Sequence, residues 1–125
     1  MLSDFELHVI STPEINNSTP DQGAGGFNFR TPTLRNLSIT GPYMHNGRFN
    51  SLERVMNFYR DLSRGNSQNT NVQNGQLSSE LSKLNVRNRD FPFIIAFLRA
   101  LNDSSFDRSV PASVPSGLSV GGNIN

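Results

Sequence analysis

Residues 29–49 read FRTPTLRNLSITGPYMHNGRF, and this stretch determines how the rest of the chain is interpreted. It contains Pro32, Gly41, Pro42 and Gly47, residues that interrupt regular structure. So many breakers within one stretch favour a compact loop over a long helix or strand. The sequence that follows has a different pattern, in which apolar residues recur at helical spacing.

Two helices are expected to form the framework. Over residues 51–62, apolar side chains lie on one face, with Asn50 as N-cap and Glu53 completing a capping box. Residues 90–101 read DFPFIIAFLRAL and follow the same logic, with Asp90 as N-cap. This second helix is apolar around most of its circumference. We therefore expect it to be buried against the first helix and whatever else fills the core.

The other segments are expected to be short or irregular. They comprise an extended piece at 1–10 with Phe5, Leu7 and Val9 on one face, surface loops at 11–28 and 63–76, a turn or two of helix at 77–84, and a Pro- and Gly-rich tail from residue 110. Asp4, Glu6 and His8 are interpreted as surface charges, not as a metal-binding cluster.

Composition excludes several classes of function and of site but does not indicate a particular one. The 125 residues suffice for one small domain with a thin core, because 34% are hydrophobic. Eleven basic and ten acidic residues give a net charge of +1, which provides no field for nucleic acid. No apolar run is long enough for a membrane span. The absence of cysteine excludes disulfides, thiolate metal sites and covalent haem attachment within this chain.

The pattern Thr-x-Pro-Tyr-x-His-x-Gly at 40–47, with the helix after it, resembles the signature of bacterial dihaem cytochrome c peroxidases and MauG. The resemblance extends from LSDF at 2–5 into the tail. It implies a mainly α fold: a cytochrome c-like domain fragment with two principal helices, long loops and an extended C-terminal tail. The expected division is a partial C-terminal domain at 1–109 and the tail at 110–125.

The same resemblance implies the electron-transfer haem domain of a periplasmic oxidoreductase that reduces hydrogen peroxide when intact. Its cofactor would be haem c, although the Cys-x-x-Cys-His attachment motif is absent here. Its partners would be the missing N-terminal peroxidatic haem domain and a small electron-donor protein. The chain alone would not be catalytic. The alternative is a haemless binding or structural module derived from that domain.

Tyr59 is the implied axial ligand of the haem. It lies at the position, relative to His45, where peroxidases of this family place a methionine ligand and MauG places a tyrosine. A phenolate ligand stabilises ferric iron. Spacing alone favours a different reading, in which Tyr59 is simply part of the helix's apolar stripe. The resemblance places His45 near the haem without ligating it, and Met44 and Met56 are rival thioethers or packing residues at its edge.

Two further sets of residues acquire roles from the resemblance. Arg35 and Arg48 flank the motif and would pair with haem propionates, since guanidinium groups suit carboxylates. Solvated surface charge is the alternative for each. The backbone carbonyls of Thr40 and Pro42 match positions that bind calcium at a domain interface, where oxygen ligands suit a hard cation.

Overall fold

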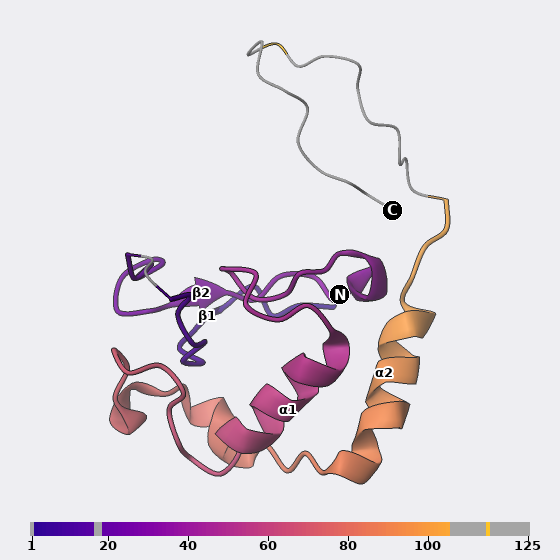
Figure 1. Ribbon diagram of the computed structural model, residues 1–125. Coiled ribbons are helices and arrows are strands. Elements are labelled where there is room, and N and C mark those ends of the chain that lie inside the picture. The colour runs from indigo at the N-terminus through magenta and orange to yellow at the C-terminus, as the bar shows by residue number, and fades with distance from the viewer. Residues whose placement is uncertain (1, 17–18, 106–114, 116–125) are drawn as a thin grey trace.

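The structure is a computed structural model that describes residues 2–16, 19–105 and 115. Its elements, shown in Figure 1, are β1 (Leu7–His8), β2 (Phe29–Arg30), η1 (Leu37–Ile39), α1 (Leu52–Leu62), η2 (Asn74–Gln76), η3 (Ser79–Lys83), η4 (Asn88–Asp90) and α2 (Phe91–Ala100), where η denotes a 3-10 helix. The predicted mainly α class, with two principal helices and long loops, is confirmed. The predicted tail at 110–125 lies outside the described residues, except for position 115.

The start of α1 differs from the prediction by one residue. Ser51 is the N-cap: its backbone is extended, and its side chain accepts a hydrogen bond from the Arg54 N–H at 3.3 Å. The prediction of Asn50 as cap, with Glu53 in a capping box, is therefore wrong, because Arg54 occupies the third helical position. Asp90 is the N-cap of α2 as predicted, although its side chain caps no α2 amide.

α1 packs against other elements on two sides. Toward α2 it contributes to what we call the helix-pair cluster, made of Leu52, Met56, Ile95 and Leu98. Toward the loops it contributes to the loop cluster, made of Phe58, Leu62 and Leu81. Leu62 is the most deeply buried of these side chains, with 1% of its surface exposed. α1 therefore organises both parts of the core.

α2 is covered on one side only. Ile95 and Leu98 are buried against α1, whereas Phe93 and Phe97 are 77% and 53% exposed. The expectation that this helix would be buried around most of its circumference is therefore wrong for the described chain, because nothing in it packs on the second side (Figure 1). No helix among the described residues is both long and apolar enough to cross a bilayer.

The two strands form a minimal antiparallel sheet. The predicted common face of Phe5, Leu7 and Val9 does not form, since Val9 is buried while Phe5 and Leu7 are 45% and 50% exposed. Phe5 has a φ of 58°, in the left-handed region that non-glycine residues rarely adopt. This residue turns the chain before β1 and breaks the strand alternation on which the prediction depended.

Residues 63–76 contain interior positions as well as surface ones. Asn69 and Val72 are each only 4% exposed. The Asn69 side-chain amide donates to the Thr12 carbonyl at 2.8 Å and to the Glu14 carboxylate at 2.9 Å. The interpretation of this segment as a surface loop is therefore incomplete: a buried amide ties it to a second loop across a long sequence separation.

Candidate functional site

The loop at 43–49 is closed by the backbone. The Tyr43 N–H donates to the Phe49 carbonyl at 2.7 Å, and the Tyr43 hydroxyl donates to the Leu37 carbonyl at 2.6 Å. Gly47 has a φ of 68°, and a Cβ there would lie 3.2 Å from the Pro42 ring. The positive φ therefore favours glycine at this position, and a side chain would also crowd the Pro42 ring. The loop therefore holds Tyr43 in a fixed place.

His45 lies against β2. Its ring stacks on Phe29 with centroids 3.7 Å apart and planes 9° from parallel. Burial lowers the pKa of His45, and the nearby carboxylates of Asp21 and Glu14 oppose this more weakly. The imidazole is accordingly neutral at neutral pH. His45 remains exposed as a residue, so one face of the ring is held while its edge reaches solvent.

Tyr59 lies at the edge of the loop cluster, where Met44 packs as well. Its ring meets Phe58 edge-on, with centroids 5.4 Å apart. Burial raises the pKa of the Tyr59 hydroxyl. No residue in the described part of the chain hydrogen-bonds this hydroxyl, and no fully buried polar side-chain atom there lacks a partner. The Tyr59 oxygen is therefore unpartnered but reachable from solvent.

The structure separates the two candidate methionines. Met44 accompanies Tyr59 at the loop cluster. Met56 belongs to the helix-pair cluster and is 6% exposed, packed between the two helices. The structure thus brings Met44 and Tyr59 to one cluster and places Met56 in the other, where it fills the interface with α2.

The predicted arginines do not converge. Arg35 is exposed and acts electrostatically on Asp103, whose pKa is lowered mainly by hydrogen bonds from Ser105. Arg48 lines an open surface pocket of about 410 Å³ together with Arg54, which the sequence analysis did not single out. Tyr59 does not line this pocket.

Thr40 and Pro42 are both exposed near the end of η1. Neither carbonyl accepts a hydrogen bond from the described part of the chain, so both oxygens are free to bind a further group. The described residues contain no group of three or more acidic, histidine or cysteine side chains able to hold a metal. Two carbonyls alone do not complete a calcium site.

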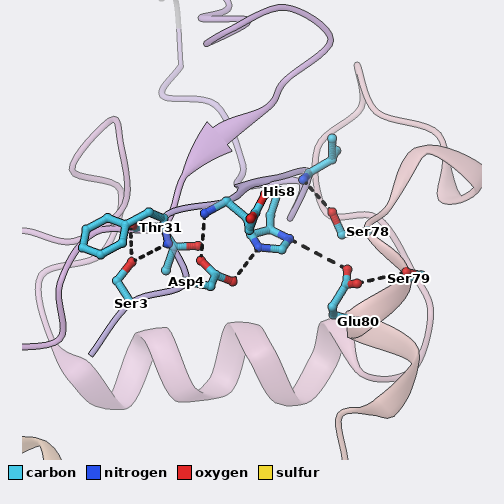
Figure 2. Close-up of polar contacts among 10 residues, drawn as sticks. Ser3, Asp4, His8, Thr31, Ser78, Ser79 and Glu80 are labelled. Carbon is cyan, nitrogen blue, oxygen red and sulfur yellow. Dashed lines mark hydrogen bonds and ion pairs between the residues drawn. The ribbon is translucent and has the colours of Figure 1, made fainter. Parts of the chain in front are cut away.

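Asp4 and His8, two of the three residues interpreted from the sequence as surface charges, form a polar cluster with Glu80 (Figure 2). The His8 Nε2 lies 2.9 Å from an Asp4 carboxylate oxygen, and its Nδ1 lies 3.8 Å from Glu80 on η3. We call these three residues the His8 clasp. The Asp4 carboxylate also accepts from the Glu6 N–H at 3.1 Å, a turn that the left-handed Phe5 makes possible.

The clasp tethers the N-terminal segment to η3. Beside it, the Val9 N–H donates to the Ser78 hydroxyl at 2.9 Å, and the Ser78 N–H donates back to the Val9 carbonyl at 3.1 Å. The hydrogen bond from His8 is the main cause of the lowered pKa of Asp4. Because the two carboxylates contact different nitrogens of His8, they cannot share one metal ion with it. In the sequence, the Asp-x-x-x-His spacing of Asp4 and His8 was the signal that could have predicted their contact.

Comparison with known proteins agrees with the sequence motif. No protein-family model matches the chain. The methylamine utilization protein MauG of Methylophilus methylotrophus is 32% identical over 83 residues, covering 66% of this chain and 22% of that protein. The cytochrome-c peroxidase IdrP1 of Pseudomonas sp. (strain SCT) is 43% identical over 77 residues, covering 61% of this chain and 18% of that protein.

A solved structure is also similar. A MauG-like protein associated with microbial copper homeostasis superposes with a TM-score of 0.59 and 27% identity, covering 82% of this chain and 36% of that one. The chain spans only about a fifth of the length of the curated relatives named above, 22% and 18%. Over about two thirds of its length, the chain is therefore homologous to one part of the proteins of the MauG and cytochrome-c peroxidase family.

Proposed function

We propose that this chain is part of the electron-transfer haem domain of a dihaem, peroxidase-like oxidoreductase, and that it supplies the Tyr59 side of the haem site. The single observation that carries the proposal is the state of Tyr59: a phenol at the edge of an apolar cluster, unpartnered within the described chain. A half-buried tyrosine hydroxyl ordinarily finds a hydrogen-bond partner. The Tyr59 hydroxyl is therefore available to a further ligand.

The described residues fit one side of a haem. The Tyr59 oxygen is accessible, and the Met44 side chain and the loop cluster offer an apolar wall beside it. His45, the residue after Met44 in the same loop, is stacked on Phe29. The other side is not supplied, because the chain has no cysteine and hence no covalent attachment point. A complete site therefore requires residues from another part of a longer protein.

When bound, the haem would supply one-electron redox chemistry, and a phenolate would favour its ferric state. The contribution of this chain is electrostatic as well as geometric. Burial raises the pKa of Tyr59, so the hydroxyl keeps its proton unless a cation offsets the charge of the phenolate. If Tyr59 were to hold the iron as a phenolate, its hydroxyl would have to give up this proton.

The remaining part of the intact protein would also cover α2. Phe93 and Phe97 project an exposed apolar face, which in a longer protein would pack against residues outside this chain. The free carbonyls of Thr40 and Pro42 would add two oxygen ligands for calcium at such a junction. The intact enzyme would reduce hydrogen peroxide, a reaction that the peroxidase name of a relative supports. Its location in the periplasm and its small electron-donor protein are proposed from the sequence resemblance alone.

The test is an absorption titration of the folded chain with haemin, with far-UV circular dichroism as the folding control. We expect saturable binding and a ferric-phenolate charge-transfer band. Tyr59→Phe should abolish the band. Tyr43→Phe is the matched control, because it removes the other tyrosine hydroxyl, which already donates to the Leu37 carbonyl.

Two results would count against the proposal. A band that survives in Tyr59→Phe would show that another residue ligates the iron. A folded chain that binds no haemin at all would instead favour a haemless binding or structural module derived from the same domain.

A further inference from the structure

A surface pocket of about 410 Å³ is lined by two arginines, two phenylalanines, two side-chain amides and one carboxylate: Arg48, Arg54, Phe49, Phe58, Asn57, Gln68 and Asp61. Its volume lies in the range of small-molecule sites. Arg48 approaches from the loop before α1, and Arg54 from the first turn of the helix. The proposed function assigns no role to Arg54 or to this hollow.

The pocket and Tyr59 occupy different sides of one helix. Arg54, Asn57 and Asp61 recur at the spacing that places residues on a single helix face. Tyr59 follows Arg54 by five residues, which turns it about 140° around the helix axis. Arg54 and a group bound at the Tyr59 hydroxyl would therefore lie on different faces of α1, although Phe58, which also lines the pocket, contacts the Tyr59 ring.

The charges in the pocket leave an excess of positive charge. Neither the Arg48 nor the Arg54 guanidinium has an ion-pair, hydrogen-bond or ring partner among the described residues. The Asp61 carboxylate, in contrast, is already neutralised by Arg60 at 2.8 Å and approached by Arg64 at 3.8 Å. The two free guanidinium groups are thus the charges available to a ligand, and they select an anion.

The floor of the pocket is apolar and fixed. Phe49 and Phe58 pack against one another with ring centroids 5.4 Å apart. The Gln68 side-chain amide donates to the Phe58 carbonyl at 3.2 Å, and the Gln68 N–H donates to the Ser11 hydroxyl at 3.1 Å. Aromatic side chains beside two guanidinium groups suit a ligand with a planar apolar body and one carboxylate.

We propose that this pocket binds a small planar carboxylate, with the carboxylate held between Arg48 and Arg54 and the apolar body over Phe49. Arginine recognises carboxylates through paired N–H donors in a fixed fork. Pairing with a haem propionate is an alternative source of the same chemistry. Arg54 lies about 140° around α1 from Tyr59, which favours a soluble ligand over a propionate of a Tyr59-ligated haem.

The test is a nuclear magnetic resonance titration of the folded, isotope-labelled chain with benzoate as the probe and benzamide as its neutral isostere. We expect saturable shifts confined to residues around Arg48, Phe49 and Arg54 with benzoate, and none with benzamide. Arg48→Gln and Arg54→Gln should each weaken benzoate binding about tenfold, the typical size of one charge-assisted contact. Arg99→Gln, on α2 and outside the pocket, is the matched control and should change nothing.

Two further measurements distinguish this pocket from the proposed haem site. Tyr59→Phe should leave benzoate binding unchanged, and haemin bound at Tyr59 should not displace benzoate. Displacement by haemin would assign the pocket to a propionate and overturn the proposal. Equal binding of benzamide, or no saturable shift in the dispersed spectrum of the folded wild-type chain, would also overturn it. Because the wild-type titration decides these outcomes, a variant that fails to fold does not weaken the test.

Discussion

α1 and α2 differ in how much of their apolar surface is covered. α1 is the less apolar of the two, yet it is packed on both sides, between the helix-pair cluster and the loop cluster. α2 is more apolar and is covered on one side only, leaving Phe93 and Phe97 at the surface. Apolar content tells how much surface a helix needs to bury, whereas topology determines what covers it.

This difference has a consequence for how the chain is used. An exposed run of large apolar side chains on a packed helix marks a surface for interaction. The chain covers about a fifth of the length of its relatives, 22% and 18% for the two named above. The proposed function would place the uncovered side of α2 against residues outside this chain. The coverage of α1 and the exposure of α2 can each be tested.

The largest effect is expected from Leu62→Ala, which tests the coverage of α1. Leu62 is 1% exposed at the loop cluster, and removing such a side chain leaves a cavity. We expect the free energy of unfolding to fall by about 2–5 kcal/mol, measured by urea denaturation. Leu7→Ala is the matched control, because Leu7 is 50% exposed. Equal losses from the two variants would contradict the assignment of Leu62 to the core.

A smaller loss is expected from Asn69→Ala, which tests how the loops cover the end of α1. The substitution leaves the Thr12 carbonyl and the Glu14 carboxylate without their donor. An unsatisfied buried polar group costs about 1–3 kcal/mol, and we expect a loss of that size together with faster proteolysis within 63–76. Asn66→Ala, at an exposed position of the same segment, should be neutral. Neutral behaviour of both variants would argue against a structural role for Asn69.

The sequence predicted those parts of the molecule that depend on local pattern. Both helices, the loop before α1 and the position of Asp90 follow from periodicity and breaker residues. The burial of Asn69 and the pairing of His8 with Glu80 were not predictable, because they join segments far apart in the chain. The left-handed conformation of Phe5 left no signal either, since this residue type rarely adopts it.

For the candidate site, the motif identified Tyr59 and His45, but it could not show their surroundings. Spacing placed Met56 and Tyr59 on neighbouring turns, whereas the structure assigns them to different clusters. Arg54 was missed, because a single exposed arginine on a helix carries no pattern. Its significance depends on a pocket shared with Arg48, which only the tertiary structure reveals.

A smaller loss of stability is expected at low pH. The reason is that carboxylates of the His8 clasp, which ties the N-terminal segment to η3, lose their charge in acid. The pKa of Asp4 lies below its ordinary value of 3.8, mainly because its carboxylate hydrogen-bonds with His8. The pKa of Glu80 lies below its ordinary value of 4.5, mainly because of hydrogen bonds with its own backbone and with Ser79, and His8 contributes less. The folded state therefore favours both carboxylates ionised. That stabilisation is present above the ordinary values and is lost as the pH falls through the lowered ones. Because both groups are exposed, the loss should be small.

The acid effect is measured by urea denaturation at a series of pH values below 5. Asp4→Asn is the matched variant, since an amide oxygen can still accept from the Glu6 N–H but carries no charge. We expect Asp4→Asn to reduce the pH dependence of the free energy of unfolding without removing the turn closed by the Glu6 N–H. An unchanged profile would show that the clasp does not contribute to the stability of the described fold.

The smallest effect is expected from Phe93→Ser, which tests the uncovered side of α2. A side chain that is 77% exposed has little to lose, so we expect the free energy of unfolding to change by no more than about 0.5 kcal/mol. Ile95→Ala, two residues away but 7% exposed, should cost several times more. Light scattering should show less self-association for Phe93→Ser. A large loss of stability at Phe93 would mean that this face is already covered within the chain, and the contrast between the two helices would no longer hold.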